Sequence, residues 1–303
     1  MTTVVALGGD ALIRPGERGT AAEQLANLRG TSAALTPLFA DARVVVTHGN
    51  GPQVGNELLR QERAAAEVPP LPLWLAVAQT QAEVGALVER ELAPVAARPV
   101  VCLLTHVRVD EHDPAFDDPT KPVGPFYEAE RARELGEERG WKLHLDARRG
   151  YRRLVPSPEP LEIVELAAIR ALLGAGACVI ACGGGGIPVA RGEGRLKGLD
   201  AVIDKDRTSA LLAAALAAER LVVLTDVPAL FRNYGVARER EVRELSPAEA
   251  EALAPELDSG SMRPKIEAAA AFVRATGGEA LVTSAAVLPQ ALEGAAGTRV
   301  ARG

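Results

Sequence analysis

The stretch Val44-Val45-Val46-Thr47-His48-Gly49-Asn50-Gly51-Pro52-Gln53-Val54-Gly55 decides the fold, because an apolar run ends at two glycines and a helical pattern follows. It predicts a buried strand, a glycine turn and a helix N-terminus. Pro52 suits the first helical position, and the unpaired N–H groups of a first helical turn attract anions. No Lys or Arg occurs between Arg43 and Arg60, so an anion bound at this turn needs cations from elsewhere in the chain.

Apolar runs of the same kind recur along the 303-residue chain, with predicted helices between them. Continuous runs indicate strands buried on both faces, and strands interleaved with helices indicate a largely parallel sheet with helices on both sides. The fold class is therefore α/β. We expect strands over Thr3–Leu7, Arg43–Thr47, Val100–Thr105, Cys178–Cys182, Leu221–Thr225 and Glu279–Thr283, and helices over Ala21–Asp41, Leu73–Leu92, Pro160–Gly174, Asp206–Ala218 and Pro264–Thr276.

The segment Val107–Pro158 breaks this alternation. It is rich in Asp, Pro, Gly, Arg and aromatic residues and shows no repeated helical or strand pattern. A long irregular insertion in a compact domain is usually functional, often as a lid or a binding subdomain. We interpret it as a small excursion over the site.

Composition limits the partners and the compartment. The formal net charge of −6 argues against nucleic acid and anionic membrane, because both need a basic face, although a small anionic ligand needs only a few local cations. The N-terminus lacks a basic segment and a signal-length apolar run, and no apolar stretch is long enough to span a membrane, so we expect a cytoplasmic protein. Cys178 and Cys182 lie roughly 13 Å apart on a predicted strand, too far for a disulfide, and we expect buried thiols.

Glycines follow three of the predicted strands, at Gly8–Gly9, Gly49–Gly51 and Gly183–Gly186, and Thr225-Asp226 ends a fourth. Ligands of parallel α/β sheets collect beyond the carboxyl ends of the strands, so the three glycine junctions together indicate anion binding by backbone amides. The sequence has no P-loop and no protein-kinase motif set. The second junction resembles a dinucleotide-binding turn, but the acidic strand end that such a site needs is absent.

Two lysines are candidates for the missing cations. Lys205 stands between Asp204 and Asp206 just before a predicted helix, where a carboxylate pair can hold a flexible ammonium in a fixed direction. Lys265 falls in the first turn of another helix, a position that the helix dipole disfavours for a cation unless an anion binds there.

Two other groups of residues could carry chemistry. His48 could act as a base, but a histidine beside a glycine turn more often caps or packs it, and no nucleophile pattern accompanies this one. The acidic loop of Asp110, His112, Asp113, Asp117 and Asp118 could be read as a metal cluster. A solvated loop is the better interpretation of that spacing, and we assign no metal ligand.

The chain resembles the carbamate kinases of the amino-acid-kinase superfamily over nearly its whole length. The Gly-Gly and Asp-Lys-Asp elements are shared widely in that superfamily, whereas Thr47-His48-Gly49-Asn50-Gly51-Pro52-Gln53 and Pro119-Thr120-Lys121-Pro122 match motifs of the carbamate kinase branch. Further matching stretches are Val5–Gly9, Asp113–Phe116, Arg152–Pro158, Gly183–Val189, Ala201–Asp206, Leu224–Val227 and Gly260–Lys265.

The resemblance implies a fold and a reaction. The fold would be a three-layer αβα sandwich around an eight-stranded, mainly parallel sheet, forming a homodimer. An N-terminal acid-binding lobe would span about 1–195, with a protruding subdomain at about 108–158, and a C-terminal nucleotide lobe would span about 196–303. The reaction would be reversible phosphoryl transfer between ATP, bound with Mg²⁺, and carbamate, giving ADP and carbamoyl phosphate.

The resemblance also implies roles for individual residues. Lys205 and Lys265 would neutralise phosphate charge, Asp206 would orient them, and Lys121 would act as a clamp from the subdomain. The acid and the γ-phosphoryl group would bind at Gly8, Gly9, Gly49, Asn50 and Gly51. The nucleotide would lie against Lys205, Thr225, Asp226, Met262 and Lys265.

The chain departs from the family pattern at Asp10, where Asn is usual, and at Arg263, where Gly is usual. An added carboxylate beside an anion site weakens binding unless it is turned away or paired, whereas Arg263 could add a cation or face solvent. Two alternatives fit the same residues. One is an acylphosphate-forming kinase for another small carboxylate, and the other is a non-catalytic sensor of carbamoyl phosphate or nucleotide.

Overall fold

The computed structural model describes residues 1–14, 16–146, 150–192, 194–236, 238–258 and 261–302. Its centre is an eight-stranded sheet in the order β15-β17-β16-β12-β1-β2-β9-β3, in which every neighbouring pair is parallel except β16 and β17. The expected α/β class and the eight-stranded, mainly parallel sheet are confirmed.

All six expected strands belong to this sheet. They are β1 (Thr2–Leu7), β2 (Arg43–His48), β3 (Val100–Cys102), β9 (Cys178–Ile180), β12 (Arg220–Leu224) and β16 (Glu279–Thr283), joined at one edge by β15 (Glu244–Leu245) and β17 (Thr298–Val300). The strand β9 is shorter than expected because Cys182 adopts a left-handed backbone conformation with φ 53°. Cys178 and Cys182 are buried free thiols, as expected.

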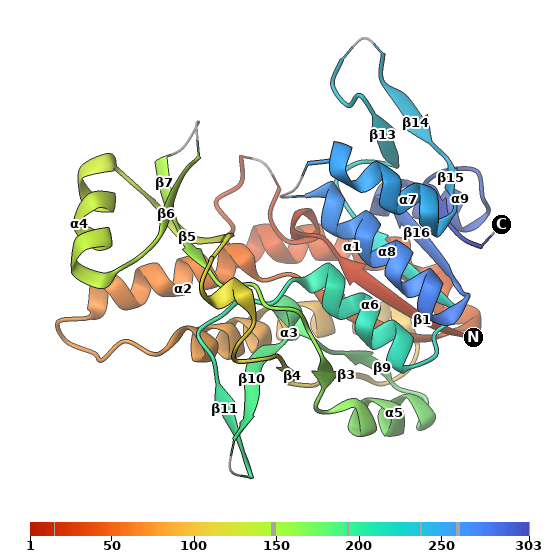
Figure 1. Ribbon diagram of the computed structural model, residues 1–303. Helices are drawn as coiled ribbons and strands as arrows, with labels where there is room; N and C mark the ends of the chain where they lie inside the picture. Colours follow the sequence, from red (N-terminus) through yellow and green to blue (C-terminus); the bar gives the residue numbers. More distant parts are fainter. Residues whose placement is uncertain (15, 147–149, 193, 237, 259–260, 303) are drawn as a thin grey trace.

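Helices cover both faces of the sheet (Figure 1). The helices that connect the strands fall into two groups. One group is α1 (Ala21–Asp41), α2 (Gly51–Ala64), α3 (Leu73–Ala96) and α9 (Leu288–Leu292), and the other is α5 (Leu166–Gly174), α6 (Lys205–Ala215), α7 (Pro247–Leu253) and α8 (Met262–Thr276). The bounds of α1 match the expectation, because Thr20 and Glu23 form a capping box at its start. The helix expected from Pro160 begins only at Leu166, since Glu162–Ile163 forms strand β8.

The core has two parts because successive strand residues point to opposite faces. Val4, Val45 and Val179 pack in a cluster with side chains of α6 and α8, whereas Val5, Val46 and Ile180 pack with α1 and α3. Both faces are therefore buried, and this explains the continuous apolar runs. Among the described residues, no helix is both long enough and apolar enough to cross a membrane.

The expectation that Val107–Pro158 is irregular is wrong. This segment contains a three-stranded antiparallel sheet in the order β5-β7-β6, formed by β5 (Lys121–Tyr127), β7 (Gly150–Val155) and β6 (Leu143–Asp146), with α4 (Ala129–Arg139) beside it. The prolines of β5 obscured the strand, but β5 is an edge strand, where a missing N–H is tolerated. Figure 1 shows this unit standing away from the main sheet, over α2.

Close packing holds the small sheet on α2. A Cβ atom added at Gly55 of α2 would lie 3.4 Å from the backbone of Gly124 in β5, so the two backbones touch without intervening side chains. The Tyr127 hydroxyl of β5 donates a hydrogen bond to Glu62 of α2 at 2.9 Å. Burial and Glu62 raise the pKa of Tyr127, so its hydroxyl keeps its proton.

A second sheet, in the order β11-β10-β4-β8, was not expected from the sequence. It comprises β4 (His106–Arg108), β8, β10 (Ile187–Gly192) and β11 (Arg195–Gly198). A separate hairpin of β13 (Leu230–Arg232) and β14 (Arg240–Val242) projects from the side that carries α7.

Candidate active site

The expected strand junctions lie side by side. The strands β12, β1, β2 and β9 are consecutive neighbours in the sheet and run parallel, so their carboxyl ends share one edge. Thr225-Asp226, Gly8–Gly9, Gly49–Gly51 and Gly183–Gly186 therefore follow four adjacent strands. The helix α6 begins at this edge with Lys205.

The β2–α2 turn has the features of an anion cradle. Asn50 is the N-cap residue of α2, yet its side chain does not cap the helix and instead donates to the Thr80 hydroxyl at 2.9 Å. Pro52 stands in the first helical turn, as expected, and the first intrahelical bond runs from Val54 to the Asn50 carbonyl. The first-turn amides are thus left without a side-chain cap, which is the arrangement that favours a bound anion.

His48 packs the turn. Its ring is fully buried, and its Nδ1 lies 2.9 Å from the Gly49 carbonyl oxygen, which requires a proton on Nδ1. Burial, together with the nearby charge of Lys205, lowers its pKa to about 4. A neutral imidazole with no exposed surface fits the packing interpretation of this residue.

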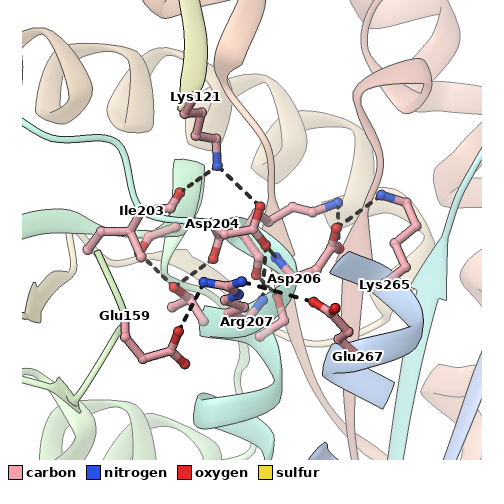
Figure 2. A network of polar contacts seen from close by, with 12 residues as sticks. Lys121, Glu159, Ile203, Asp204, Asp206, Arg207, Lys265 and Glu267 are labelled. Atoms are coloured by element: carbon pink, nitrogen blue, oxygen red, sulfur yellow. Dashed lines mark hydrogen bonds and ion pairs between the residues drawn. The ribbon is translucent and has the colours of Figure 1, made fainter. Parts of the chain in front are cut away.

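One carboxylate, that of Asp206, joins the two lysines that the sequence singled out (Figure 2). The Lys205 ammonium lies 3.2 Å from Asp206 Oδ1, and the Lys265 ammonium donates to Asp206 Oδ2 at 3.0 Å. The side chains are only 12%, 6% and 12% exposed for Lys205, Asp206 and Lys265. Burial lowers the pKa of Lys205, and the carboxylate counteracts this shift.

Lys205 also connects the site to the first glycine junction. Its ammonium donates to the Leu7 carbonyl at 2.8 Å, directly before Gly8-Gly9. A Cβ atom added at Gly49 would lie 3.9 Å from its Cδ, so its side chain passes beside the β2–α2 turn as well. The cation missing from the glycine turn is therefore supplied by the start of α6.

Asp204 does not hold Lys205 in the way that the Asp-Lys-Asp pattern suggested. It accepts an ion pair from Lys121 at 3.2 Å instead, and Lys121 also donates to the Ile203 carbonyl at 3.2 Å. Lys121, at the start of β5, is thereby brought to the N-terminus of α6 (Figure 2), whereas Lys205 forms its ion pair with Asp206.

The expectation that Gly183–Gly186 binds an anion through its amides does not hold for Gly185 and Gly186, whose amides bond within the chain, and it stays a prediction for Gly183 and Gly184. All four residues are buried, and the amides of Gly185, Gly186 and Ile187 bond to the carbonyls of Cys182, Gly183 and Thr105. The glycines serve close packing: an added Cβ would lie 2.4 Å from the His48 ring at Gly183, 2.3 Å from the Asn50 side chain at Gly184, and 2.4 Å from the Ile203 carbonyl at Gly185. This run thus forms the floor beneath the cradle and the Asp-Lys-Asp segment.

The expected nucleotide residues lie at the ends of two elements. Thr225 is buried after β12 and donates to the exposed Asp226 at 3.1 Å, and Met262 begins α8, one turn before Lys265. The guanidinium of Arg263 donates hydrogen bonds to the carbonyls of Ala254 and Pro255. It is therefore bound to the chain segment before α8 and does not add a cation beside Lys205 and Lys265. The side chain of Asp10 and residue Gly260 lie outside the described residues.

Comparisons with known proteins agree on one family. Residues 1–284 match the model of the amino acid kinase family. The chain is 43% identical to a carbamate kinase of Trichomonas vaginalis, over 99% of each chain, and 44% identical to one of Halobacterium salinarum, over 98% and 97%. It superimposes on the carbamate kinase from Giardia lamblia bound to AMP-PNP with a TM-score of 0.92 and 38% identity, covering 100% of this chain and 98% of that one.

The chain belongs to the carbamate kinases of the amino acid kinase family. A more distant match, the N-acetylglutamate synthase from Neisseria gonorrhoeae, is 20% identical with a TM-score of 0.59 and shares the fold alone. Membership in the carbamate kinases, rather than in the wider family, agrees with the Thr-His-Gly-Asn-Gly-Pro-Gln and Pro-Thr-Lys-Pro motifs.

Two features of this carbamate kinase family member became visible only in three dimensions. The pattern predicted that Asp204 helps to hold Lys205, whereas its actual partner, Lys121, lies 83 positions away in sequence. Gln81 of α3 was not singled out, although its amide donates to the Gly183 carbonyl at 2.7 Å and accepts from the Thr105 amide. Its position in the buried face of α3 was the one signal available.

The acidic loop around residues 110–118 is explained by local structure. Asp113 caps a short 3-10 helix (Pro114–Phe116) and accepts from the Glu159 amide, Asp110 accepts from the His112 amide, and Asp118 pairs with Lys142. These contacts fit a hydrated loop that is held by its own side chains.

Proposed function

We propose that this protein transfers the γ-phosphoryl group of ATP to carbamate, reversibly, giving ADP and carbamoyl phosphate. The observation that carries the proposal is the sharing of Asp206 by Lys205 and Lys265 beside the amide-rich β2–α2 turn. Its relatives at 43% and 44% identity are carbamate kinases, and a related carbamate kinase has been captured with AMP-PNP, an ATP analogue.

Phosphoryl transfer to carbamate requires mainly that the reactants are aligned and that phosphate charge is neutralised. Carbamate is already an anion, so no general base is needed, and a buried neutral His48 is compatible with that. Phosphoryl transfer is accelerated mainly by alignment and by neutralising charge on the transferred group. Lys205 and Lys265 would bind phosphate oxygens, and Asp206 would hold both ammonium groups in place.

The acid and the nucleotide would bind on opposite sides of this charge centre. The amides of Gly8, Gly9, Asn50 and Gly51 would hold the acid and the γ-phosphoryl group within an N-terminal lobe of about 1–195. Thr225, Asp226 and Met262 would border the nucleotide within a C-terminal lobe of about 196–303, and the subdomain of about 108–158 would bring Lys121.

We infer that Mg²⁺ enters with the nucleotide. Mg²⁺ retains several waters and binds substrate phosphates together with one or two carboxylates. Among the described residues, no three His, Cys, Asp or Glu side chains group in a way that could hold a metal ion by themselves, so a metal carried by the phosphates fits this site best. When bound, Mg²⁺ supplies further charge neutralisation.

Replacing Lys205 by Met tests the proposal. ATP formation from carbamoyl phosphate and ADP, followed in a coupled assay and also in reverse, should fall by orders of magnitude while the fold is retained. Lys197→Met is the matched control, because Lys197 is exposed on β11 and pairs with Glu111. Near-normal ATP formation in Lys205→Met would refute the role of Lys205. Turnover of acetylglutamate or aspartate without turnover of carbamate, or saturable binding without any exchange between ADP and ATP, would overturn the proposed function.

We also propose that the protein is a cytoplasmic homodimer, as the family resemblance implies. Three free cysteines, Cys102, Cys178 and Cys182, suit a reducing compartment. Sedimentation equilibrium should give twice the chain mass of 31.7 kDa, and a monomer at micromolar concentration would contradict this proposal.

A further inference from the structure

Asp204 divides its two carboxylate oxygens between two elements (Figure 2). Oδ1 accepts from the amides of Asp206 and Arg207 at 2.9 and 3.2 Å and so caps the N-terminus of α6. Oδ2 accepts from the Lys121 ammonium at 3.2 Å. One side chain therefore joins the start of α6, which carries Lys205, to the start of β5 in the small sheet.

The Asp204 carboxylate is charged throughout the working range of an enzyme. Burial acts to raise its pKa, but Lys121 and the Arg207 amide outweigh burial and lower the pKa to about 2. The pair is partly shielded from water, with side chains 28% and 22% exposed for Lys121 and Asp204. A charge-assisted hydrogen bond in this setting is stronger and more directional than a pair on the open surface.

Lys121 and Lys205 each contact one backbone carbonyl and one aspartate. An ammonium has three N–H donors. Lys121 uses one on the Ile203 carbonyl and one on Asp204, and Lys205 has the Leu7 carbonyl and Asp206 as its corresponding partners. Lys121 is thus fixed by hydrogen bonds to one backbone carbonyl and one aspartate, which set the direction of its third N–H. Lys205 is held by its hydrogen bond to the Leu7 carbonyl and by its ion pair with Asp206.

We propose that Asp204 is a positioning residue that aims the Lys121 ammonium at the transferred phosphoryl group, as Asp206 does for Lys205. The inference rests on the proposed function. Lys121 has a flexible four-carbon stem and comes from a separate small sheet, so without a fixed partner its ammonium would lose orientation. The Asp-Lys-Asp motif would then serve two lysines from two different elements.

Two substitutions separate positioning from capping. Asp204→Asn keeps an oxygen that can cap α6, but it presents an amide nitrogen to Lys121. An amide nitrogen cannot accept a hydrogen bond from an ammonium group. Asp204→Ser also caps well but is too short to reach Lys121. If capping were its whole role, both variants would behave like the unmodified protein. We expect each to lower kcat/KM for carbamoyl phosphate about tenfold, because an oriented charge is lost in the transition state.

A double-mutant cycle with Lys121→Met decides whether Asp204 acts through Lys121. In the Lys121→Met background, Asp204→Asn should change kcat/KM less than twofold. An equal loss in both backgrounds, or no loss in the unmodified background, would overturn the inference. Complete inactivity of the unmodified protein toward carbamoyl phosphate would instead refute the proposed function.

A binding measurement keeps the inference testable without turnover. The unmodified protein, Asp204→Asn, Lys121→Met and the double variant are each titrated by calorimetry in the presence of Mg²⁺. One ligand is AMP-PNP, and the other is ADP, which lacks the third phosphoryl group. We expect Asp204→Asn to weaken AMP-PNP binding several-fold only where Lys121 is present, and to leave ADP binding unchanged. Equal weakening of both ligands would show that Asp204 acts only through the cap of α6.

Discussion

His48 should make the stability of this protein fall in mild acid. Its imidazole is buried and neutral in the folded state, with a pKa lowered from 6.5 to about 4 by burial and by Lys205. The unfolded chain returns the group to its ordinary value. Between these two values the unfolded state binds more protons than the folded state, so the free energy of unfolding decreases as the pH falls below about 6.5 and levels off below about 4.

The size of the effect follows from that shift. Each pKa unit is worth about 1.4 kcal/mol, so the change of about 2.5 units sets a limit of about 3.4 kcal/mol, of which about 2 kcal/mol develops between about pH 7.5 and about pH 5. The full value applies without a discount for solvent, because the side chain has no exposed surface.

Urea unfolding measures this contribution directly. The two tryptophans provide a fluorescence signal, and His48→Gln replaces the titrating ring by a side chain that stays neutral. The variant is compared with the unmodified protein at several pH values and one protein concentration. Whatever constant cost the substitution carries, its free energy of unfolding should lose about 2 kcal/mol less than that of the unmodified protein between about pH 7.5 and about pH 5.

His144→Gln, which replaces an exposed histidine of β6, is the control for the loss of an imidazole as such. Parallel stability curves for His48→Gln and the unmodified protein would refute the reasoning, because they would mean that the buried ring takes up its proton equally in both states.

Three further predictions concern packing and charge. Gly183→Ala should cost about 1–3 kcal/mol in urea unfolding, because the new Cβ overlaps a buried ring, whereas Gly192→Ala, with no atom within 4 Å, should stay within about 0.5 kcal/mol; equal effects would contradict this. Asp206→Asn should reduce kcat for ATP formation at least about 100-fold, because both site lysines lose their carboxylate, and a kcat near that of the unmodified protein would count against the shared role. Tyr127→Phe should cost about 1 kcal/mol by removing the bond to Glu62, and an unchanged free energy of unfolding would mean that this bond does not hold the small sheet.

The main sheet could be predicted because its strands are buried on both faces. Runs such as Val44–Thr47 and Leu221–Thr225 carry this signal locally, and a capping box fixes the start of α1. The strand β5 could not be predicted, because its prolines are tolerated only at the edge of a sheet. That edge exists only in the folded subdomain.

The candidate site divides in the same way. The Asp-Lys-Asp motif identified the charged residues, but not which aspartate pairs with which lysine, because these partners come from elements 59 and 83 positions away. For Gly183–Gly186, a glycine run that binds an anion and one that packs against His48 and Asn50 look identical in sequence. The difference lies in where the amides find their partners, and here the amides of Gly185 and Gly186 bond to carbonyls of the chain itself.

The sharing of Asp206 by two lysines has a consequence for product release. A buried ammonium that loses an anionic partner and finds no other is strongly destabilised. Both ammonium groups of this protein keep their contact with Asp206 when no phosphate is bound, so the empty centre would carry one net positive charge rather than two. The remaining positive charge would attract a phosphate group, and the shared carboxylate would lower the cost of that group's dissociation.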